Sequence, residues 1–455
     1  MKWGRAATAL ALVGALTGCA AWEQNAPRPA QRLSWTGCSP EVQCSTLTVP
    51  ASWHEPDGPT TKVNLARLPA VGRRAGSVVV NLGSGNGTGA MLGQIPPALR
   101  ELARDFDVVV FDAPGLGRDD NGTLIRCVQA PSVYGLVRDQ TEAGWAAQAR
   151  ANAAHDASCR KAAGAAYDHL TSWQVANDLD ALRAALGEEK LRYVGNSYGT
   201  SFGQAYAEHF GSRVERMYLD GVADHTQPDL LTWLTDHART QEDQLLRFRD
   251  WCAATPSCAL HGVDAAAVWD QVVASGRTQV GVLVGLTPPR WPDLATALAG
   301  GAFPTAPPPE PFGSVQPALL CHDFLPDVPS YQEFLAIEER LRGVAPRVGW
   351  LAGRMQLGRC VGIEGGPAYP PAPLKTRGLP PVLVGIGERD NNTPNLGARR
   401  VAEQLPGSRT VWHGDGHAAY LLGNRCLAGH VRAYLAEGTL PPDGTRCPAE
   451  LPIGP

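Results

Sequence analysis

The pentapeptide Gly-Asn-Ser-Tyr-Gly at 195–199 constrains the fold of this chain more than any other segment. It directly follows the apolar run 191–194 and precedes a stretch with helical spacing. A sharp turn between a strand and a helix holds a serine in a strained conformation, with its hydroxyl projecting into open space. Glycines two residues before and after the serine let neighbouring backbone approach closely. The pattern therefore predicts a nucleophile at Ser197, and an ordinary helix N-cap is the alternative.

An acid and a histidine follow Ser197 in the order Ser, Asp, His, which one fold of serine hydrolases uses. The apolar run 381–387 predicts a buried parallel strand that ends shortly before Asp390, and a second strand predicted at 409–412 leads through Gly-Asp-Gly to His417. Both side chains then lie at carboxyl ends of neighbouring strands, where open α/β sheets bind their ligands. Three rivals for these two roles are Glu388, Asp220 and His413.

Short apolar runs alternate with helical patterns through the first half of the chain. One helix is predicted from the spacing of Val175, Leu179 and Leu182, with Thr171 or Ser172 as N-cap. Alternating strands and helices imply a parallel sheet with right-handed crossovers. Together with the serine turn, this predicts an α/β class protein with the α/β-hydrolase fold and a mostly parallel sheet. The further predicted strands are 77–82, 107–111, 191–194 and 214–219.

At 455 residues the chain is long enough for a second domain. The strand–helix alternation stops after Gly221, and helical patterns mixed with proline-rich runs follow until about Leu379. We predict a largely helical cap domain inserted before the acid-bearing strand, where a roof excludes water and selects substrates. The predicted division is signal peptide 1–19, first part of the core 20–221, cap domain 222–379 and second part of the core 380–455. Five cap tryptophans could line a cleft or pack in the core: Trp233, Trp251, Trp269, Trp291 and Trp350.

The N-terminus predicts export. Lys2 and Arg5 precede an apolar stretch that is too short to span a bilayer. The stretch ends in Leu-Thr-Gly-Cys, which resembles the lipidation motif of bacterial lipoproteins, so we predict a lipid anchor on Cys19 that holds the protein at a membrane. An ordinary cleaved signal peptide is the alternative. The predicted location is extracytoplasmic, lipid-anchored at the bacterial cell membrane or secreted.

The other ten cysteines fall into five near-neighbour pairs, which in an oxidising compartment predict disulfides, with free buried thiols as the alternative. No Cys-x-x-Cys or His-Glu-x-x-His occurs, so we predict no metal and no cofactor. A formal net charge of only −4 gives no indication of nucleic-acid binding. The near-neighbour pairs are Cys38 with Cys44, Cys127 with Cys159, Cys252 with Cys258, Cys321 with Cys360 and Cys426 with Cys447.

Short motifs are spread over most of the chain outside the cap, at 81–89, 112–118, 178–183, 195–200, 217–222, 389–394, 398–402 and 416–417. With the C-terminal segment 381–447, they resemble the secreted tripeptidyl aminopeptidase family of actinobacteria, which are relatives of the proline iminopeptidases. The resemblance implies a serine peptidase in which Ser197 attacks, His417 transfers protons and Asp390 orients the imidazole.

The oxyanion donors implied are the backbone N–H groups of Tyr198, the residue after the nucleophile, and of Ser84. This chain departs from the family around Ser84. The family's Asn-Pro-Gly-Gly-Pro-Gly is Asn-Leu-Gly-Ser-Gly-Asn here, and Asp119 replaces a serine of the next motif. The identity of the second donor therefore stays open.

The resemblance further implies release of tripeptides from peptides with a free N-terminus. Such a site needs a carboxylate that pairs with the substrate's ammonium group. The first alternative is a carboxylesterase of the cell envelope with the same triad, and the second is an inactive binding protein. The candidate carboxylates of the cap are Glu242, Asp243, Asp323, Glu333, Glu338 and Glu339.

Overall fold

The computed structural model describes residues 31–85, 87–117, 123–276, 286–303, 314–325, 328–363 and 369–451. The predicted signal peptide with Cys19 lies outside the described residues, as does Asp119. Within the described ranges, every helix falls short of the length or the apolar character that crossing a membrane requires. The lipid anchor on Cys19 therefore stays a prediction.

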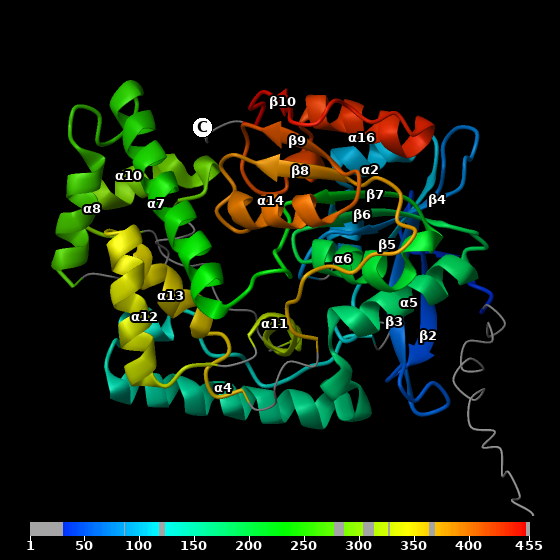
Figure 1. Cartoon of the computed structure of the whole chain (residues 1–455), viewed down its shortest axis with the longest axis horizontal. Coiled ribbons are helices and arrows are strands. Elements are labelled where there is room, and N and C mark those ends of the chain that lie inside the picture. The colour runs from blue at the N-terminus through cyan, green and yellow to red at the C-terminus, as the bar shows by residue number, and fades with distance from the viewer. Residues whose placement is uncertain are drawn as a thin grey trace, which may run out of the picture.

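The described residues form one ten-stranded sheet with the order β1-β2-β3-β5-β4-β6-β7-β8-β9-β10 (Figure 1). The pairs from β5 to β10 are parallel, whereas β1, β2, β3 and β5 pair antiparallel along one edge. The strands are β1 (Thr36–Gly37), β2 (Gln43–Pro50), β3 (Thr60–Leu68), β4 (Ser77–Asn81), β5 (Asp107–Phe111), β6 (Leu191–Asn196), β7 (Val214–Asp220), β8 (Leu383–Gly387), β9 (Arg409–His413) and β10 (Thr445–Cys447). The predicted α/β-hydrolase fold is confirmed.

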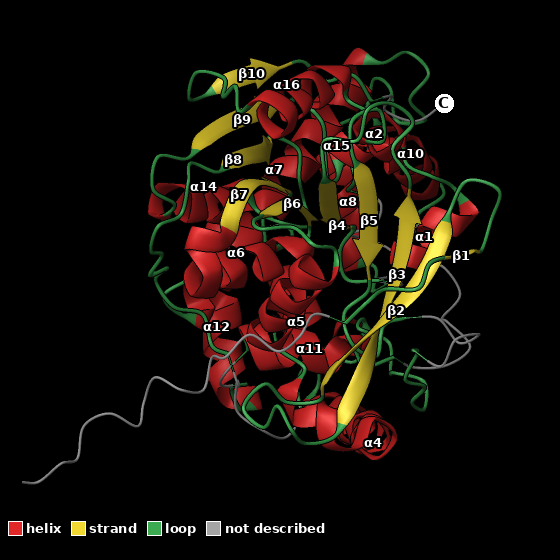
Figure 2. Cartoon of the chain, turned by 90° about the vertical axis from the view of Figure 1, so that its right-hand side faces the viewer, coloured by secondary structure: helices red, strands yellow, loops and turns green. Residues whose placement is uncertain are grey.

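Helices cover both faces of the sheet. The central strands β4 and β5 are continuous runs of buried valine, as expected for strands packed on both sides. On one face lie α5 (Ser172–Ala185), α6 (Gly199–Phe210) and α14 (Asn395–Gln404). On the other face lie α1 (Gly87–Gly93), α2 (Pro97–Leu102), α15 (Ala419–Leu422) and α16 (Arg425–Glu437). Figure 2 shows the sheet twisting between β2, next to the edge strand β1, and the other edge strand β10.

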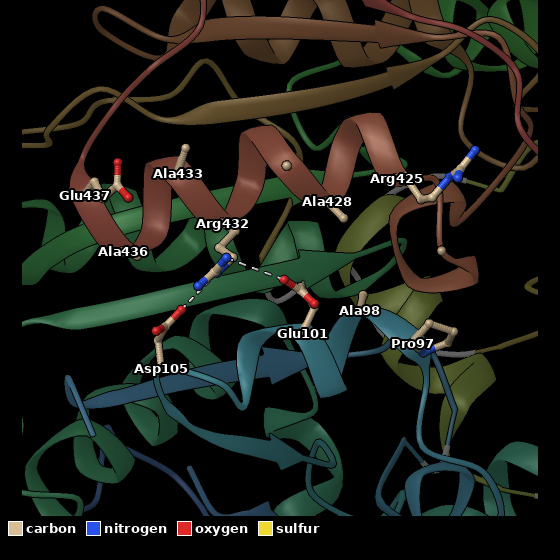
Figure 3. Close-up of a pocket in the computed structure, with 12 residues that line it drawn as sticks. Pro97, Ala98, Glu101, Asp105, Arg425, Ala428, Arg432, Ala433, Ala436 and Glu437 are labelled. Atoms are coloured by element: carbon tan, nitrogen blue, oxygen red, sulfur yellow. Dashed lines mark hydrogen bonds and ion pairs between the residues drawn. The ribbon is translucent and has the colours of Figure 1, made fainter. Parts of the chain in front are cut away.

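On the face of the sheet opposite α5 and α6, helices α2 and α16 lie side by side (Figure 3). Arg432 of α16 forms ion pairs with Asp105 at 3.0 Å and Glu101 at 3.7 Å. A cavity of about 510 Å³ lies between these helices. None of the predicted catalytic residues lines this cavity.

A second group of helices follows β7 and precedes β8 in the chain, as predicted for the cap. In Figure 1 most of these helices lie to the left of the sheet, whereas α11 lies below α14 and contributes to the core under the sheet. They are α7 (Leu230–Ala254), α8 (Ala265–Ala274), α10 (Trp291–Ala299), α11 (Gln316–Phe324), α12 (Tyr331–Val344) and α13 (Gly349–Leu357). They have a hydrophobic core of their own, which includes Trp269 and Trp291.

Two helices from before the serine turn also join this second core. They are α3 (Gly135–Arg138) and the 22-residue α4 (Glu142–Ala163), whose Trp145 stacks on Phe334 with ring centroids 5.1 Å apart. α4 runs along the lower edge of the molecule in Figure 1. The cap boundaries predicted at 222 and 379 stay a prediction. Residues 135–149 also pack in the hydrophobic core of the cap helices.

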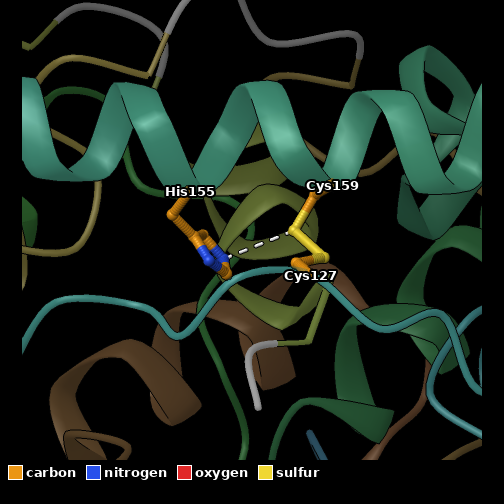
Figure 4. A group of neighbouring side chains, drawn as sticks. All are labelled: Cys127, His155 and Cys159. Atoms are coloured by element: carbon orange, nitrogen blue, oxygen red, sulfur yellow. Dashed lines mark hydrogen bonds between the residues drawn. A yellow bond between two sulfur atoms is a disulfide. The ribbon is translucent and has the colours of Figure 1, made fainter.

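The structure contains five disulfides, with the same pairing that near-neighbour spacing predicts. His155 lies beside the Cys127–Cys159 bridge in Figure 4, with Nε2 3.4 Å from the sulfur of Cys159. This Cys/His group and a second one around His430 resemble metal sites, but both pairs of sulfurs are already bonded to each other. Thiolate ligands are therefore not available at either place.

Helix α5 begins as its sequence predicts, because the side chain of Thr171 accepts a hydrogen bond from the N–H of Gln174 at 3.2 Å. The same helix carries a buried acid, Asp178. Its Oδ1 accepts from the indole N–H of Trp53 at 2.6 Å, and its Oδ2 has no partner among the described residues. Burial raises the pKa of Asp178 to about 8, although the Trp53 hydrogen bond opposes the shift.

We expect the substitution Asp178→Asn to stabilise the protein increasingly as pH rises. The carboxyl of the unfolded chain ionises near pH 4, whereas the folded one keeps its proton until about pH 8, so stability is lost between these values. The amide does not titrate, so the melting temperature of the variant should rise relative to the wild type between pH 5 and pH 8. The exposed Asp293→Asn is the control, and an equal difference at both pH values would contradict the burial argument.

Candidate active site

Ser197 occupies the turn between β6 and α6 with a φ of 54°. The described non-glycine residues with positive φ are Ser197 and Ala418, which follows His417. The N–H of Ser197 donates to the carbonyl of Asp220 at 2.9 Å, which ties the turn to the end of β7. Backbone strain of this kind is typical of functional sites in which surrounding contacts fix the conformation.

The glycines on both sides of the serine are required by close packing. A Cβ on Gly195 would lie 2.6 Å from the carbonyl oxygen of Gly199, and one on Gly199 would lie 2.5 Å from Oδ1 of Asn81. Real Cβ atoms do not approach backbone so closely, so larger residues would force the turn apart. The close backbone approach that the glycine pattern predicts is therefore present in the turn.

Asp390 and His417 lie after β8 and β9 and form a direct hydrogen bond. The Nδ1 of His417 is 2.8 Å from Oδ2 of Asp390, a buried carboxylate that is 2% exposed. The backbone N–H groups of Asn392 and Thr393 each donate to Oδ1 at 2.9 Å, and the Thr393 hydroxyl donates to Oδ2 at 2.7 Å. These donors satisfy the buried charge and fix the carboxylate that orients the imidazole.

Asp220 and Gly221, at the end of β7, lie against Ser197 and His417 respectively. The carbonyl of Asp220 holds the N–H of Ser197, and a Cβ on the next residue, Gly221, would lie 2.9 Å from Cε1 of His417. Among the described residues, no hydrogen bond joins the Ser197 hydroxyl to His417. Such bonds are often long in unliganded enzymes and shorten when the substrate binds. The structure thus brings the three predicted residues to one edge of the sheet, with the direct contact made between two of them.

The rivals from the sequence occupy other positions. Asp220 lies beside His413, with Oδ1 3.5 Å from Nε2, and both side chains are 1% exposed. Glu388 forms an ion pair with Arg446. The charges near His417 nevertheless matter, because burial disfavours the imidazolium whereas Asp390, and more weakly Asp220, favour it. The net effect raises the pKa of His417.

The two predicted oxyanion donors line the same pocket as Ser197. Within the described chain, the N–H groups of Tyr198 and Ser84 have no hydrogen-bond partner. Tyr198 stands at the start of α6, where backbone N–H groups lack partners within the helix. The neighbouring loop is held by the side chain of Asn196, which donates to the carbonyl of Leu82 at 3.1 Å.

The pocket has a volume of about 490 Å³. It is lined by residues at the carboxyl ends of the strands and by residues of the helical insert, which is the group of helices between β7 and β8. Trp233 lines it, in contrast to Trp269 and Trp291, which pack in the core. Two buried acids, Asp224 and Asp236, also line it. Both form ion pairs with Arg400 of α14, and the Asp236 oxygen lies 2.8 Å from the guanidinium.

The six carboxylates predicted from the cap sequence do not line this pocket. Asp323 accepts from the Tyr198 hydroxyl at 2.6 Å, and Glu242 accepts from the N–H of Arg347 at 3.0 Å. The others cap a helix, pair with arginines or face solvent. No sequence pattern points to Asp224 or Asp236, because their proximity to Arg400 exists only in the folded chain. Thr393 lies in the motif at 389–394, but no sequence pattern indicates its contact with Asp390.

Comparison with known proteins agrees with this geometry. A family model described as TAP-like protein matches residues 346–447, which contain Asp390 and His417. Serine protease Hip1 of Mycobacterium tuberculosis H37Rv is 28% identical over 97% of this chain and 96% of its own. Tripeptidyl aminopeptidase of Streptomyces lividans is 27% identical over 89% and 84%. Over most of its length the chain is similar to tripeptidyl aminopeptidases, and it has the α/β-hydrolase fold. It is therefore a serine hydrolase of the peptidase type.

Specificity differs among the relatives. Carboxylesterase B of Mycobacterium tuberculosis H37Rv is 28% identical over 93% of this chain and 91% of its own length. Its percentage of identity is the same as that of the protease. Overall identity therefore does not decide between amide and ester substrates, and the residues of the pocket must be considered.

We expect Asp390→Asn to lower kcat by about four orders of magnitude, as loss of the orienting carboxylate does in other serine hydrolases. The residual activity should have its acid limb at lower pH than the wild type. The reason is that the charge of Asp390 favours protonated His417, which must be neutral to accept the serine proton. The pH dependence of kcat/KM checks this, with Asp220→Asn as the comparison. A larger loss from Asp220→Asn would assign the acid to β7 instead.

We also expect Thr393→Val to lower kcat roughly ten- to hundredfold. A hydrogen bond to a charged group contributes about 1.5–3 kcal/mol, and without the hydroxyl Asp390 is held less firmly. Thr393→Ser retains the hydroxyl and should keep most of the activity. Equal kcat values for the valine and serine variants would show that the hydroxyl does not position the acid.

Proposed function

We propose that this protein is an exported serine exopeptidase that releases tripeptides from peptides with a free N-terminus. The observation that supports the proposal is the acidic group formed by Asp224, Asp236 and Arg400 at the pocket that contains Ser197. Two carboxylates and one guanidinium leave one negative charge in excess. A substrate ammonium group is the complement of that charge.

The proposed chemistry uses the residues at the ends of β6, β8 and β9. The Ser197 hydroxyl attacks the carbonyl carbon and passes its proton to His417, while Asp390 keeps the imidazole in the correct tautomer. The N–H groups of Tyr198 and Ser84 donate to the oxyanion that develops. Protonated His417 then delivers the proton to the leaving amine. Water, activated by the same imidazole, hydrolyses the acyl-enzyme and restores the free serine.

The acidic group gives a physical reason for exopeptidase action. Asp224 and Asp236 are 8% and 6% exposed, so their charges are poorly screened by water. A buried carboxylate pairs strongly with an ammonium ion, whereas an acetylated N-terminus has no charge and leaves the carboxylate without that partner. The distance between Ser197 and this group would then determine how many residues are released, and the similarity to tripeptidyl aminopeptidases supports three.

The proposal includes an extracytoplasmic location with a lipid anchor on Cys19. Five disulfides are typical of proteins from oxidising compartments, which supports export. The anchor rests on the sequence motif at 16–19 alone. Mass spectrometry of the membrane fraction would detect a diacylglyceryl group on Cys19, and Cys19→Ala would move the protein to the soluble fraction.

A carboxylesterase is the second candidate, favoured by the similarity to carboxylesterase B. Esters are cleaved by the same triad and need no ammonium site. The acidic group would then have a structural role, holding α7 against α14 through Arg400. Amide and ester substrates that share the same acyl part would separate the two candidates.

We expect a tripeptide p-nitroanilide with a free N-terminus to be cleaved with a kcat/KM about ten- to hundredfold higher than its acetylated form, because the pairing of a charged group contributes about 1.5–3 kcal/mol. Asp236→Asn should reduce this ratio, whereas Asp243→Asn, on the exposed side of the same helix, should not. Ser197→Ala, with a loss in kcat of about 10^6, gives the background. Equal rates for free and acetylated substrates would exclude an exopeptidase that recognises the amine.

A further inference from the structure

Arg359 is a cation of the active-site pocket for which the described part of the chain supplies no counter-ion. It lines the pocket with Ser197 and also a smaller adjoining cavity of about 210 Å³. Among the described residues, its side chain forms no ion pair or hydrogen bond, and its Nε is buried. Arg400, by contrast, has two carboxylate partners. The half-buried guanidinium thus has a buried Nε without a partner, and an anion that enters the pocket can supply one.

The backbone on both sides of Arg359 is held firmly in place. The carbonyl of Gly358 accepts from the side chains of Gln148 at 2.9 Å and Asn152 at 3.0 Å. Asn152 also donates to the carbonyl of Val361 at 2.8 Å. The neighbouring Cys360 is bonded to Cys321 of α11. The guanidinium therefore projects from a segment fixed by α4 and by a disulfide, as expected for a binding group that is arranged in advance.

Among the described residues, no carboxylate lines the smaller cavity beside Arg359. Asp224 and Asp236 line the larger cavity but not the smaller one. His237 faces the larger cavity, where its Nδ1 lies 3.2 Å from the side-chain amide of Gln356. Burial, and secondarily the positive charge of Arg359, lower the pKa of His237 to about 4, so this residue is neutral at pH 7. Arg359 thus places a positive charge in the wall that both cavities share.

The smaller cavity lies next to the atoms of the reaction. Ser84 and Tyr198, to which we assign the oxyanion N–H groups, both line it. A side chain in this cavity would therefore belong to the residue whose carbonyl carbon is attacked. The volume suits a side chain of moderate size, and Asn152 and His155 add polar groups to its wall.

We propose that Arg359 binds the carboxylate of an acidic side chain on the residue whose carbonyl is attacked, so that the enzyme prefers to cleave after glutamate or aspartate. The planar fork of a guanidinium matches the two oxygens of a carboxylate. The inference rests on the proposed peptidase function for its substrate class. The opposite charges in the site, Asp224 and Asp236 for the ammonium and Arg359 for the side chain, would also fix the direction in which a peptide binds.

The test compares Ala-Ala-Glu and Ala-Ala-Gln p-nitroanilides, which differ in one charge at the same volume. We expect the wild type to cleave the glutamate substrate with a kcat/KM at least about tenfold higher, and Arg359→Gln to abolish or reverse this preference. Arg359→Lys should retain part of it, because the charge remains without the fork. Arg340→Gln, an exposed arginine of α12, is the matched control and should leave the ratio unchanged.

Because each ratio is measured within one variant, a smaller amount of folded enzyme does not change it. A second pair of substrates, the mono-p-nitrophenyl ester of glutaric acid and p-nitrophenyl pentanoate, measures the same preference if only esters are cleaved. Failure of the peptide substrates alone would refute the peptidase, and the ester ratio would still test Arg359. A wild type without preference for the carboxylate in both pairs, or an Arg359→Gln variant that keeps the preference, would overturn the inference.

Discussion

The active site depends on the strained turn at Ser197, which several independent contacts hold in place. The N–H of Ser197 donates to Asp220, and its carbonyl accepts from the Thr200 hydroxyl at 2.6 Å. Gly83 comes so near that a Cβ there would lie 3.3 Å from Cβ of the serine. Because β7 supplies the contact at Asp220 and the next residue packs on His417, the end of one central strand positions both of the side chains to which we assign proton transfer and attack.

Charge is compensated differently in the catalytic half of the site, which contains Asp390 and His417, and in the substrate half, which is the pocket wall around Arg400 and Arg359. Asp390 has donors for both oxygens and a histidine partner, so the catalytic charges are satisfied within the protein. The pocket walls contain an excess negative charge around Arg400 and an unpaired positive charge at Arg359. Charges that the fold does not compensate are the ones that a substrate can compensate, which is why we assign selection of substrates to them.

The sequence predicted the catalytic half of the site because that half lies in local patterns. Buried parallel strands are apolar runs, and Ser197, Asp390 and His417 each come within four residues of the end of such a run. β2 and β3 were missed, since they are partly exposed antiparallel strands with polar residues throughout. The long α4 was missed too, because its buried face is built largely from Gln148, Asn152 and other polar residues rather than from an apolar stripe.

The substrate half of the site could not be read from the sequence for a physical reason. Asp236 lies on α7, its partner Arg400 on α14 and Arg359 in the turn after α13, so their arrangement exists only after the insert has packed against the sheet. Acidic residues of the insert were the obvious candidates, yet Glu338, for instance, is paired with Arg354 inside the helical layer. Composition identifies charged residues, whereas only packing decides which of them lack a partner.

The division between sheet and insert also explains how relatives with one fold can differ in specificity. The three predicted catalytic residues follow β6, β8 and β9, whereas Asp236, His237 and Arg359 belong to the insert. Changes in the insert can therefore alter the charge of the pocket without moving the strand ends. α4 couples the two parts, since its amides hold the carbonyls of Gly358 and Val361 on either side of Arg359. α4 and the Cys321–Cys360 disulfide together therefore fix the position of Arg359 in the pocket.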